Sequence, residues 1–364
     1  MKKILIAIGD AGAGHISCAN AVSDAIKEVN QDVDIQTIDL FSLSSFTKQY
    51  NSIQYLVSKS SVAELIFNIS YRLVDKSRIF SELWYLFSMA ILYKPTLKLL
   101  KEMKPDLVIC NNALTAELLT RCKKKIYFKY VITIPDLITV ARWWASPKAD
   151  LIFSPTKEAT ERILQFYPEC KVVTGYYPLR KVPTYTKEEL KRERREFCKK
   201  VSFTPSKDII LITGCGVSTI GMIWKLDEVI SDPNYQIIIL TGKDEKLKKK
   251  LEVKFKDDSR IYISGYTRDI FRLFAISDLV IAKPGPATVL ELEKLGKKAI
   301  FTKPVGYQEF GNVKYLVKNP NFIYIGTNYG SALQEVKNLL EKENMPFNGG
   351  IKDATGMVDY LKKL

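Results

Sequence analysis

The chain has 364 residues, of which 46% are hydrophobic, and its formal net charge at pH 7 is +15. This length is enough for two domains of ordinary size. The positive charge favours an anionic partner: a nucleic acid, an acidic lipid surface or a phosphate-bearing substrate. The longest apolar run, residues 83–93, is too short to span a membrane, and no secretory signal is visible. We therefore expect a cytoplasmic protein, which can lie on a membrane without crossing it.

The cysteines and histidines argue against a metal site. Six cysteines are scattered singly, and His15 is the only histidine. A zinc site would have very few possible ligands, so we expect no metal and no other cofactor. We interpret the cysteines as reduced thiols, most of them in the core, as is usual in a cytosolic protein.

The first half of the chain alternates between strand and helix patterns. A buried-type strand is followed by a glycine-rich turn at residues 9–14, and residues 17–29 have the apolar spacing of a helix. This order predicts a parallel sheet with crossover helices. The expected strands are residues 4–8, 33–38, 106–110, 127–134 and 151–153.

The second half repeats this organisation after a change of pattern near residues 174–178. The highly charged residues 187–200 indicate a domain boundary plus a solvated helix, in preference to a binding site. The tail at residues 357–364 has the pattern of a short amphipathic helix. The expected strands begin at residue 209 and continue with residues 236–240, 261–263, 279–282 and 299–301.

These patterns predict an α/β protein with two Rossmann-like, doubly wound domains. We assign residues 1–177 to the first domain and residues 178–350 to the second. Residues 351–364 form a C-terminal helix that can pack back on the first domain.

Ligands of such sheets bind beyond the carboxyl ends of the strands. The glycine turns at residues 9–14 and 214–216 and the loop at 284–288 all follow predicted strands, and two facing domains would place them across one cleft. A helix start after residue 284 can hold phosphate through its backbone N–H groups. Glu291 can accept hydrogen bonds from ribose hydroxyls, and the amide and acid groups of residues 308–312 can hold sugar hydroxyls. This arrangement suits a nucleoside diphosphate joined to a sugar.

His15 and Asp136 are candidates for proton transfer. The first glycine turn has the spacing GxxGxG, which matches neither a dinucleotide fingerprint nor a P-loop. His15 follows it at a predicted helix start, which favours the neutral imidazole that a general base requires. Asp136 follows a strand and could orient His15 or take a proton itself. Both residues could instead be caps of turns or helices, and the following Arg142, Trp143 and Trp144 could line an acceptor site or simply pack.

Residues 41–104 combine aromatic and basic residues with few acids. Amphipathic helices that lie in a membrane interface need this combination. An ordinary helical insertion with a solvated basic face is the alternative, which composition alone favours.

Five motifs spread along nearly the whole chain match one known pattern. They are the strand–glycine turn–His–helix at residues 8–26, Lys-Pro-Asp at 104–106, Pro-Asp-Leu with a following Trp at 135–144, Pro-Gly-x-x-Thr-x-x-Glu at 284–291 and Gln-Glu-x-Gly-Asn at 308–312. Together they resemble the monogalactosyldiacylglycerol synthase and processive diacylglycerol glycosyltransferase family. That family is related more distantly to the peptidoglycan N-acetylglucosaminyltransferase that acts on an undecaprenyl-linked intermediate.

The resemblance implies the GT-B architecture and an inverting transfer of galactose or glucose from UDP-galactose or UDP-glucose. The acceptor would be diacylglycerol or a related lipid at an anionic membrane surface, on the inner face of the cell membrane. His15 becomes the leading candidate for the base, with Asp136 as a second catalytic residue. Gly265 and Tyr266 would lie against the uracil. The residues expected to bind the donor are Gly12, Gly14, Gly214, Gly216, Tyr266, Gly285, Pro286, Ala287, Thr288, Glu291, Gln308, Glu309 and Asn312.

The chain departs from the family pattern at two positions. The family's histidine after the Asp-Leu-x-Thr step corresponds to Ala141, and its threonine before the aspartate is Pro135. Acceptor specificity is therefore less well defined than donor class, and a polyprenyl or non-lipid acceptor is the alternative. A basic nucleic-acid-binding protein lacks a supporting fold signature, so no nucleic-acid partner is expected. The broken glycine spacing argues against a nicotinamide-dependent dehydrogenase.

Overall fold

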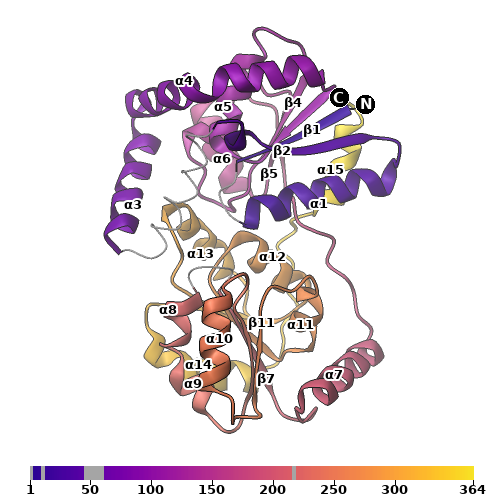
Figure 1. Cartoon of the computed structure of the whole chain (residues 1–364), viewed down its shortest axis with the longest axis vertical. Helices are drawn as coiled ribbons and strands as arrows, with labels where there is room; N and C mark the ends of the chain where they lie inside the picture. The colour runs from indigo at the N-terminus through magenta and orange to yellow at the C-terminus, as the bar shows by residue number, and fades with distance from the viewer. Residues whose placement is uncertain (1–2, 10–12, 45–60, 215–218) are drawn as a thin grey trace. The chain divides into compact units, whose positions relative to one another are not determined.

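The structure, a computed structural model, describes residues 3–9, 13–44, 61–214 and 219–364 (Figure 1). It divides into two compact units. Unit 1 comprises Met1–Lys181, Gly306–Asn312 and Gly350–Leu364, and unit 2 comprises Val182–Val305 and Val313–Gly349. The chain thus passes from one unit to the other after Lys181, Val305, Asn312 and Gly349. Each unit has the predicted doubly wound α/β fold.

Unit 1 contains a parallel sheet that is six-stranded within the described residues, in the order β2-β1-β3-β4-β5-β6. The order reverses between β1 and β3, so these neighbouring strands connect to helices on opposite sides of the sheet. In their register, Ala7 lies beside Cys110. The loops after β1 and β3 therefore meet at the switch point, where such sheets bind ligands. The strands are β1 (Lys3–Ile8), β2 (Asp34–Asp39), β3 (Leu107–Cys110), β4 (Lys129–Thr133), β5 (Leu151–Ser154) and β6 (Val172–Thr174).

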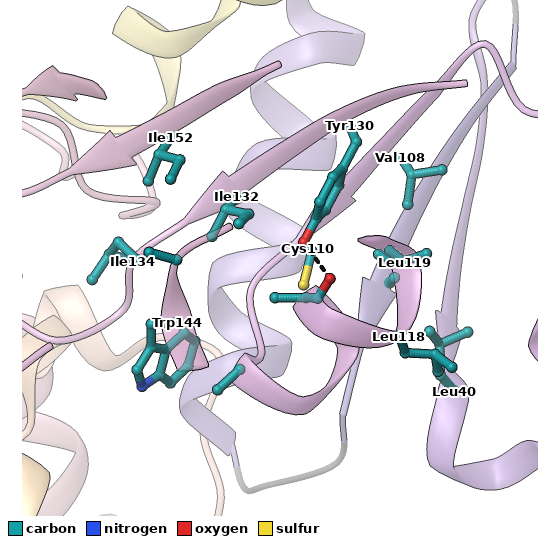
Figure 2. Packing of buried hydrophobic residues seen from close by; sticks show 14 of the residues in the cluster. Leu40, Val108, Cys110, Leu118, Leu119, Tyr130, Ile132, Ile134, Trp144 and Ile152 are labelled. Carbon is teal, nitrogen blue, oxygen red and sulfur yellow. Dashed lines mark hydrogen bonds between the residues drawn. The ribbon is translucent and has the colours of Figure 1, made fainter. Parts of the chain in front are cut away.

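Two apolar clusters form the core of unit 1. One cluster includes Tyr130, Ile132 and Trp144 (Figure 2). The other contains the C-terminal helix, whose Met357 and Val358 are buried in the same cluster as residues of α1 and the sheet. The C-terminal helix thus packs within unit 1. The helices and 3₁₀ turns are α1 (Ala13–Val29), η1 (Leu40–Leu43), α3 (Ser61–Lys76), α4 (Arg78–Met103), α5 (Ala113–Cys122), η3 (Arg142–Trp144), α6 (Lys157–Phe166), η4 (Tyr307–Glu309) and α15 (Ala354–Leu361).

Unit 2 repeats the architecture, with the strand order β12-β11-β10-β7-β8-β9 in the part of the chain that is described. Its switch point lies between β7 and β10, where Thr213 is beside Ala282. The strands are β7 (Ile209–Thr213), β8 (Gln236–Leu240), β9 (Ile261–Ser264), β10 (Leu279–Ala282), β11 (Lys298–Thr302) and β12 (Phe322–Gly326). The helices are α7 (Lys187–Val201), α8 (Thr219–Ile223), α9 (Asp227–Ser231), α10 (Glu245–Lys254), α11 (Ile270–Ile276), α12 (Pro286–Lys294), α14 (Ala332–Glu341) and the 3₁₀ turn η5 (Tyr329–Ser331), and α13 (Phe310–Leu316) begins in unit 1.

Several expectations can be compared directly with this structure. The charged residues 187–200 form the predicted helix α7, which begins with a capping box between Thr186 and Glu189. Strands β6 and β12 were not expected, although the apolar run 322–325 carried the signal. Residues 306–312 group with unit 1 and not with the second domain to which the sequence assigned them, because they contact loops of unit 1.

The described cysteines are free and buried, as expected of core thiols. Burial raises the pKa of Cys110 to about 11 and that of Cys122 to about 12, so both remain protonated near neutral pH. Cys215 lies outside the described residues. Within the described part of the chain, the helices are all too short or too polar to cross a bilayer.

Candidate active site

His15 lies in the first turn of α1, directly after the glycine-rich loop that follows β1. Gly9 in this loop cannot be replaced freely, because a Cβ atom there would lie 2.4 Å from Phe41 and 2.8 Å from the Asn112 amide. Gly9 thus lies against the residues that follow β3. Asn111 and Asn112 occupy that position, at the switch point of the sheet.

Asn111 holds His15 through two hydrogen bonds. The His15 Nδ1 atom is 2.8 Å from the backbone carbonyl oxygen of Asn111, and the Asn111 side-chain amide donates to the His15 carbonyl oxygen at 2.7 Å. A carbonyl oxygen can only accept, so Nδ1 carries the proton and Nε2 carries the lone pair of the neutral ring. This is the tautomer that a general base acting through Nε2 requires.

Trp144 stacks on His15, and Tyr71 is influenced by the charge of Asp136. The imidazole of His15 stacks on the indole of Trp144, with ring centroids 6.2 Å apart and planes 14° apart. Tyr71 of α3 is buried, which strongly raises its pKa, and the negative charge of Asp136 raises it further. Asp136 is itself buried, and its charge acts on the phenol of Tyr71.

The Gln-Glu-x-Gly-Asn motif packs against the loop that contains Asp136. Asn312 is fully buried, and its Oδ1 accepts a hydrogen bond from the backbone N–H of Leu137 at 3.1 Å. The Leu137 carbonyl accepts from the Thr156 hydroxyl at 2.6 Å, so side chains hold both backbone polar groups of Leu137. A Cβ atom at Gly311 would lie 2.2 Å from the Thr139 hydroxyl. Glycine and asparagine in the motif thus hold the loop in place, a role that the sequence did not suggest.

In unit 2, Lys283 and Thr288 surround the start of α12. The helix begins after Gly285 with Pro286 at its first position, and no side chain caps it. A Cβ atom placed on Gly285 would have the Lys283 ammonium 4.0 Å away and the Thr288 hydroxyl 3.9 Å away. A cation, a hydroxyl and helix-start N–H groups together favour a phosphate. This loop follows β10 at the switch point, beside Gly214 after β7.

Two carboxylates of α12 are buried, and one of them has a clear structural role. Glu293 accepts from the Tyr315 hydroxyl at 3.0 Å and from the Gly349 N–H at 2.9 Å. Burial raises its pKa, and these two donors partly oppose the shift. Glu291, the expected ribose ligand, is only 4% exposed. Tyr266, expected at the uracil, is 64% exposed.

The structure therefore groups the predicted site residues in two sets. His15, Gly14, Asp136, Gln308, Glu309 and Asn312 belong to unit 1, and Gly214, Tyr266, the 285–288 loop and Glu291 belong to unit 2. Gly12 and Gly216 lie outside the described residues. No group of three or more possible metal-ligating side chains is found in the ranges that the structure describes.

Sequence reasoning missed Asn111 and Tyr71. The Asn-Asn pair directly after a buried strand was a usable signal, because polar residues at carboxyl ends of parallel strands often face ligands. Tyr71 had no such signal, since one tyrosine in an amphipathic helix resembles any other.

The sequence of this chain is similar to those of known glycosyltransferases. Residues 15–167 match the model of the monogalactosyldiacylglycerol (MGDG) synthase family, and residues 219–348 match that of the glycosyltransferase family 28 C-terminal domain. A relative from Staphylococcus epidermidis, named processive diacylglycerol beta-glucosyltransferase, is 27% identical over 94% of this chain and 85% of its own length.

Solved structures with low sequence identity share the fold. Spinosyn rhamnosyltransferase SpnG is 10% identical with a TM-score of 0.64, and all of both chains is covered. Anabaena Alr3699/HepE, solved with UDP and glucose, is 14% identical with a TM-score of 0.58, covering 100% of this chain and 99% of that one. The chain is therefore a glycosyltransferase with the GT-B fold, and it resembles the monogalactosyldiacylglycerol synthase and processive diacylglycerol glycosyltransferase family.

Proposed function

We propose that this enzyme transfers a hexose from a UDP-sugar to diacylglycerol or a related lipid at a membrane surface, with inversion at the anomeric carbon. The observation that carries the proposal is the His15 imidazole, which the Asn111 carbonyl holds in the tautomer of a general base at the switch point of its sheet. The relatives' names favour glucose as the hexose and diacylglycerol as the acceptor. The solved complex of Alr3699/HepE with UDP and glucose supports the donor class.

The nucleotide part of the donor is assigned to unit 2. The diphosphate would lie at the start of α12, where the N–H groups, Lys283 and Thr288 favour negative charge. Glu291 would accept from the ribose hydroxyls. These groups stabilise the charge that develops on the leaving UDP, which is the usual source of rate enhancement in such a displacement.

The acceptor hydroxyl would be activated by His15. Nε2 takes the hydroxyl proton while the oxygen forms a bond to the anomeric carbon, and the bond from that carbon to the β-phosphate oxygen breaks with its electron pair leaving on UDP. A single in-line displacement of this kind inverts the anomeric configuration. Asp136 would assist through the polar cluster around Tyr71 and Trp144.

A membrane-binding surface is supported by α3 and α4. Five large apolar side chains of α3, spaced as one helical face, are between 45% and 65% exposed, and four of α4 are between 50% and 73% exposed. The proposed occupant is a lipid bilayer, because a face of this size is unusual on a monomer and the net charge of +15 suits anionic headgroups. We call this the α3–α4 face, and it consists of Val62, Leu65, Ile66, Ile69, Leu73, Ile79, Phe80, Leu83 and Leu86.

The transfer reaction is tested with radiolabelled UDP-glucose and UDP-galactose, diacylglycerol in vesicles, and thin-layer chromatography of the lipids. We expect a labelled glycolipid, and the proton spectrum of the product should show the inverted β-anomer. His15→Ala should reduce turnover while UDP binding, measured by calorimetry, survives. Near-normal turnover by this variant would remove His15 as the base, and a retained α-configuration would refute the single displacement.

Membrane binding is tested by sedimentation with vesicles. Replacing Leu65 and Ile69 with Asp should reduce binding to anionic vesicles, and high salt should weaken binding of the wild type. Val253→Asp is a matched control, because Val253 of α10 is 73% exposed but lies outside the α3–α4 face. Equal loss of binding in both variants would contradict the assignment of this face.

A further inference from the structure

Helix α3 has two faces with different properties. Its outer side contributes the exposed apolar residues of the α3–α4 face. Its inner side contributes Tyr71 and Asp75, which are buried four residues apart. Asp75 is held by Arg162 of α6, with Nη2 and Oδ2 3.0 Å apart. The ion pair fixes the end of α3 on unit 1.

Tyr71 contacts the segments on both sides of the site residues of unit 1. Its ring meets the edge of Trp143 at a centroid distance of 5.3 Å and lies 5.8 Å from the ring of Tyr307. Arg72, the next residue of α3, places its guanidinium 4.7 Å from the centre of the Tyr307 ring. Tyr307 directly precedes Gln308 and Glu309. The inner side of α3 thus contacts the segment that carries the expected sugar-binding residues.

Tyr71 also lies near the catalytic candidates. Its ring contacts Trp143, which directly precedes Trp144, and the negative charge of the Asp136 carboxylate raises the pKa of its phenol. Trp144 in turn stacks on the His15 ring. Tyr71 therefore contacts Trp143, which directly precedes the tryptophan that stacks on His15, and it contacts Tyr307 at the start of the 307–312 segment. The negative charge of Asp136 also acts on its phenol.

We propose that Tyr71 is a positioning residue through which α3 holds His15, Asp136 and the Tyr307–Asn312 segment in their working arrangement when its outer face lies on the lipid surface. The inference rests on the proposed function, because it assumes that the α3–α4 face binds a bilayer. It adds a consequence: binding to the bilayer raises turnover as well as concentrating the enzyme. Tyr71 touches no reacting atom in this account, and it acts through Trp144, Asp136 and Tyr307.

The test uses the full chain and two variants of Tyr71. Tyr71→Phe keeps the ring contacts with Trp143 and Tyr307 but removes the hydroxyl, and we expect kcat to fall about tenfold. Tyr71→Ala removes the ring as well, and we expect kcat to fall about 100-fold, as displaced site residues commonly cost. The KM for UDP-glucose should stay within twofold in Tyr71→Phe, which keeps the ring contact with Tyr307, and should rise in Tyr71→Ala, because the 307–312 segment carries expected sugar-binding residues. Sedimentation with anionic vesicles should be unchanged, because the outer face of α3 is intact.

The coupling to lipid is measured by comparing two acceptors. Wild-type enzyme should turn over diacylglycerol in anionic vesicles faster than dioctanoylglycerol dispersed without vesicles, and Tyr71→Ala should lose most of this ratio. Tyr130→Phe is the control for a general loss of stability. Tyr130 is fully buried in the same unit, and its hydroxyl donates to the Ala116 carbonyl at 2.8 Å. We expect this control to have a lower melting temperature with an unchanged acceptor ratio.

The outcomes separate the inference from the proposed function. If wild-type enzyme transfers no hexose to either acceptor, the proposed function fails. If wild type is active and Tyr71→Ala keeps its kcat within twofold, the positioning role is wrong. The role is also wrong if the variant loses vesicle binding in proportion to kcat, or if Tyr130→Phe loses the acceptor ratio equally.

Discussion

Replacing Gly311 with Ala tests how closely the Gln-Glu-x-Gly-Asn motif must approach its neighbouring loop. The new Cβ would lie 2.2 Å from the Thr139 hydroxyl and 2.5 Å from the Thr139 backbone nitrogen. Ordinary contact begins near 3.4 Å, so the segments must separate by about 1.2 Å. That displacement also stretches the 3.1 Å hydrogen bond from Leu137 to Asn312.

The expected loss of stability in Gly311→Ala follows from three contributions. Overpacking costs about 1–3 kcal/mol, the buried hydrogen bond contributes about 1 kcal/mol, and alanine returns about 1 kcal/mol because it favours a helix more than glycine does. We therefore expect the free energy of unfolding to fall by about 1–3 kcal/mol in urea titrations. Turnover should fall about 100-fold, because the shift moves residues on both sides of the site by about an ångström.

Two further variants sharpen this test. Gly221→Ala places its Cβ in open space within α8, so it should be neutral or slightly stabilising. Adding Thr139→Ala to Gly311→Ala should not restore activity, because the backbone nitrogen of residue 139 remains too close. Stability of Gly311→Ala at or above that of the wild type would refute the reasoning.

Three other predictions concern single side chains. Asn111→Asp puts a carboxylate against the His15 carbonyl in place of a donor at 2.7 Å, so kcat should fall about tenfold while calorimetry shows unchanged UDP affinity. Gly14→Ala meets no atom within 4 Å, so the melting temperature should stay unchanged, whereas kcat/KM should fall about tenfold if substrate needs that space. Burial lowers the pKa of Lys297 from 10.5 to about 8, so the folded state loses this proton first and stability should rise with pH between those values. Lys297→Met should remove that rise, which is measured by comparing urea midpoints at pH 8 and pH 10. The prediction is wrong if the stability of this variant rises with pH as steeply as that of the wild type.

The strands were predictable because their signal is local. Apolar runs such as residues 4–8 and 279–282 became buried parallel strands at those positions. The glycine-rich turns and the helix start after Gly285 were also local patterns, and the structure places Gly9, Gly214 and Gly285 at the switch points of the two sheets. The roles assigned there to individual donor ligands stay predictions.

The contacts that assemble the site were not predictable, because they join residues far apart in the chain. His15 and Asn111 are 96 residues apart, and Leu137 and Asn312 are 175 apart. A sequence pattern can mark Asn312 as a polar group near a ligand, but it cannot show that its amide oxygen is bonded to a loop of the other half. The same holds for Tyr71, whose importance depends on the two tryptophans and on Tyr307.

The return of the chain to unit 1 after Gly349 has a consequence for biosynthesis. The ring of Tyr360 covers those of Phe153 and Tyr176, at centroid distances of 5.9 and 5.4 Å. A nascent chain emerges from its N-terminus, so these aromatic rings stay uncovered until α15, which carries Tyr360, has left the ribosome. The first domain to be synthesised is thus the last to be completed. Chaperone binding during translation should therefore persist until α15 (Ala354–Leu361) has emerged, and a ribosome stalled before residue 350 should hold an aggregation-prone intermediate.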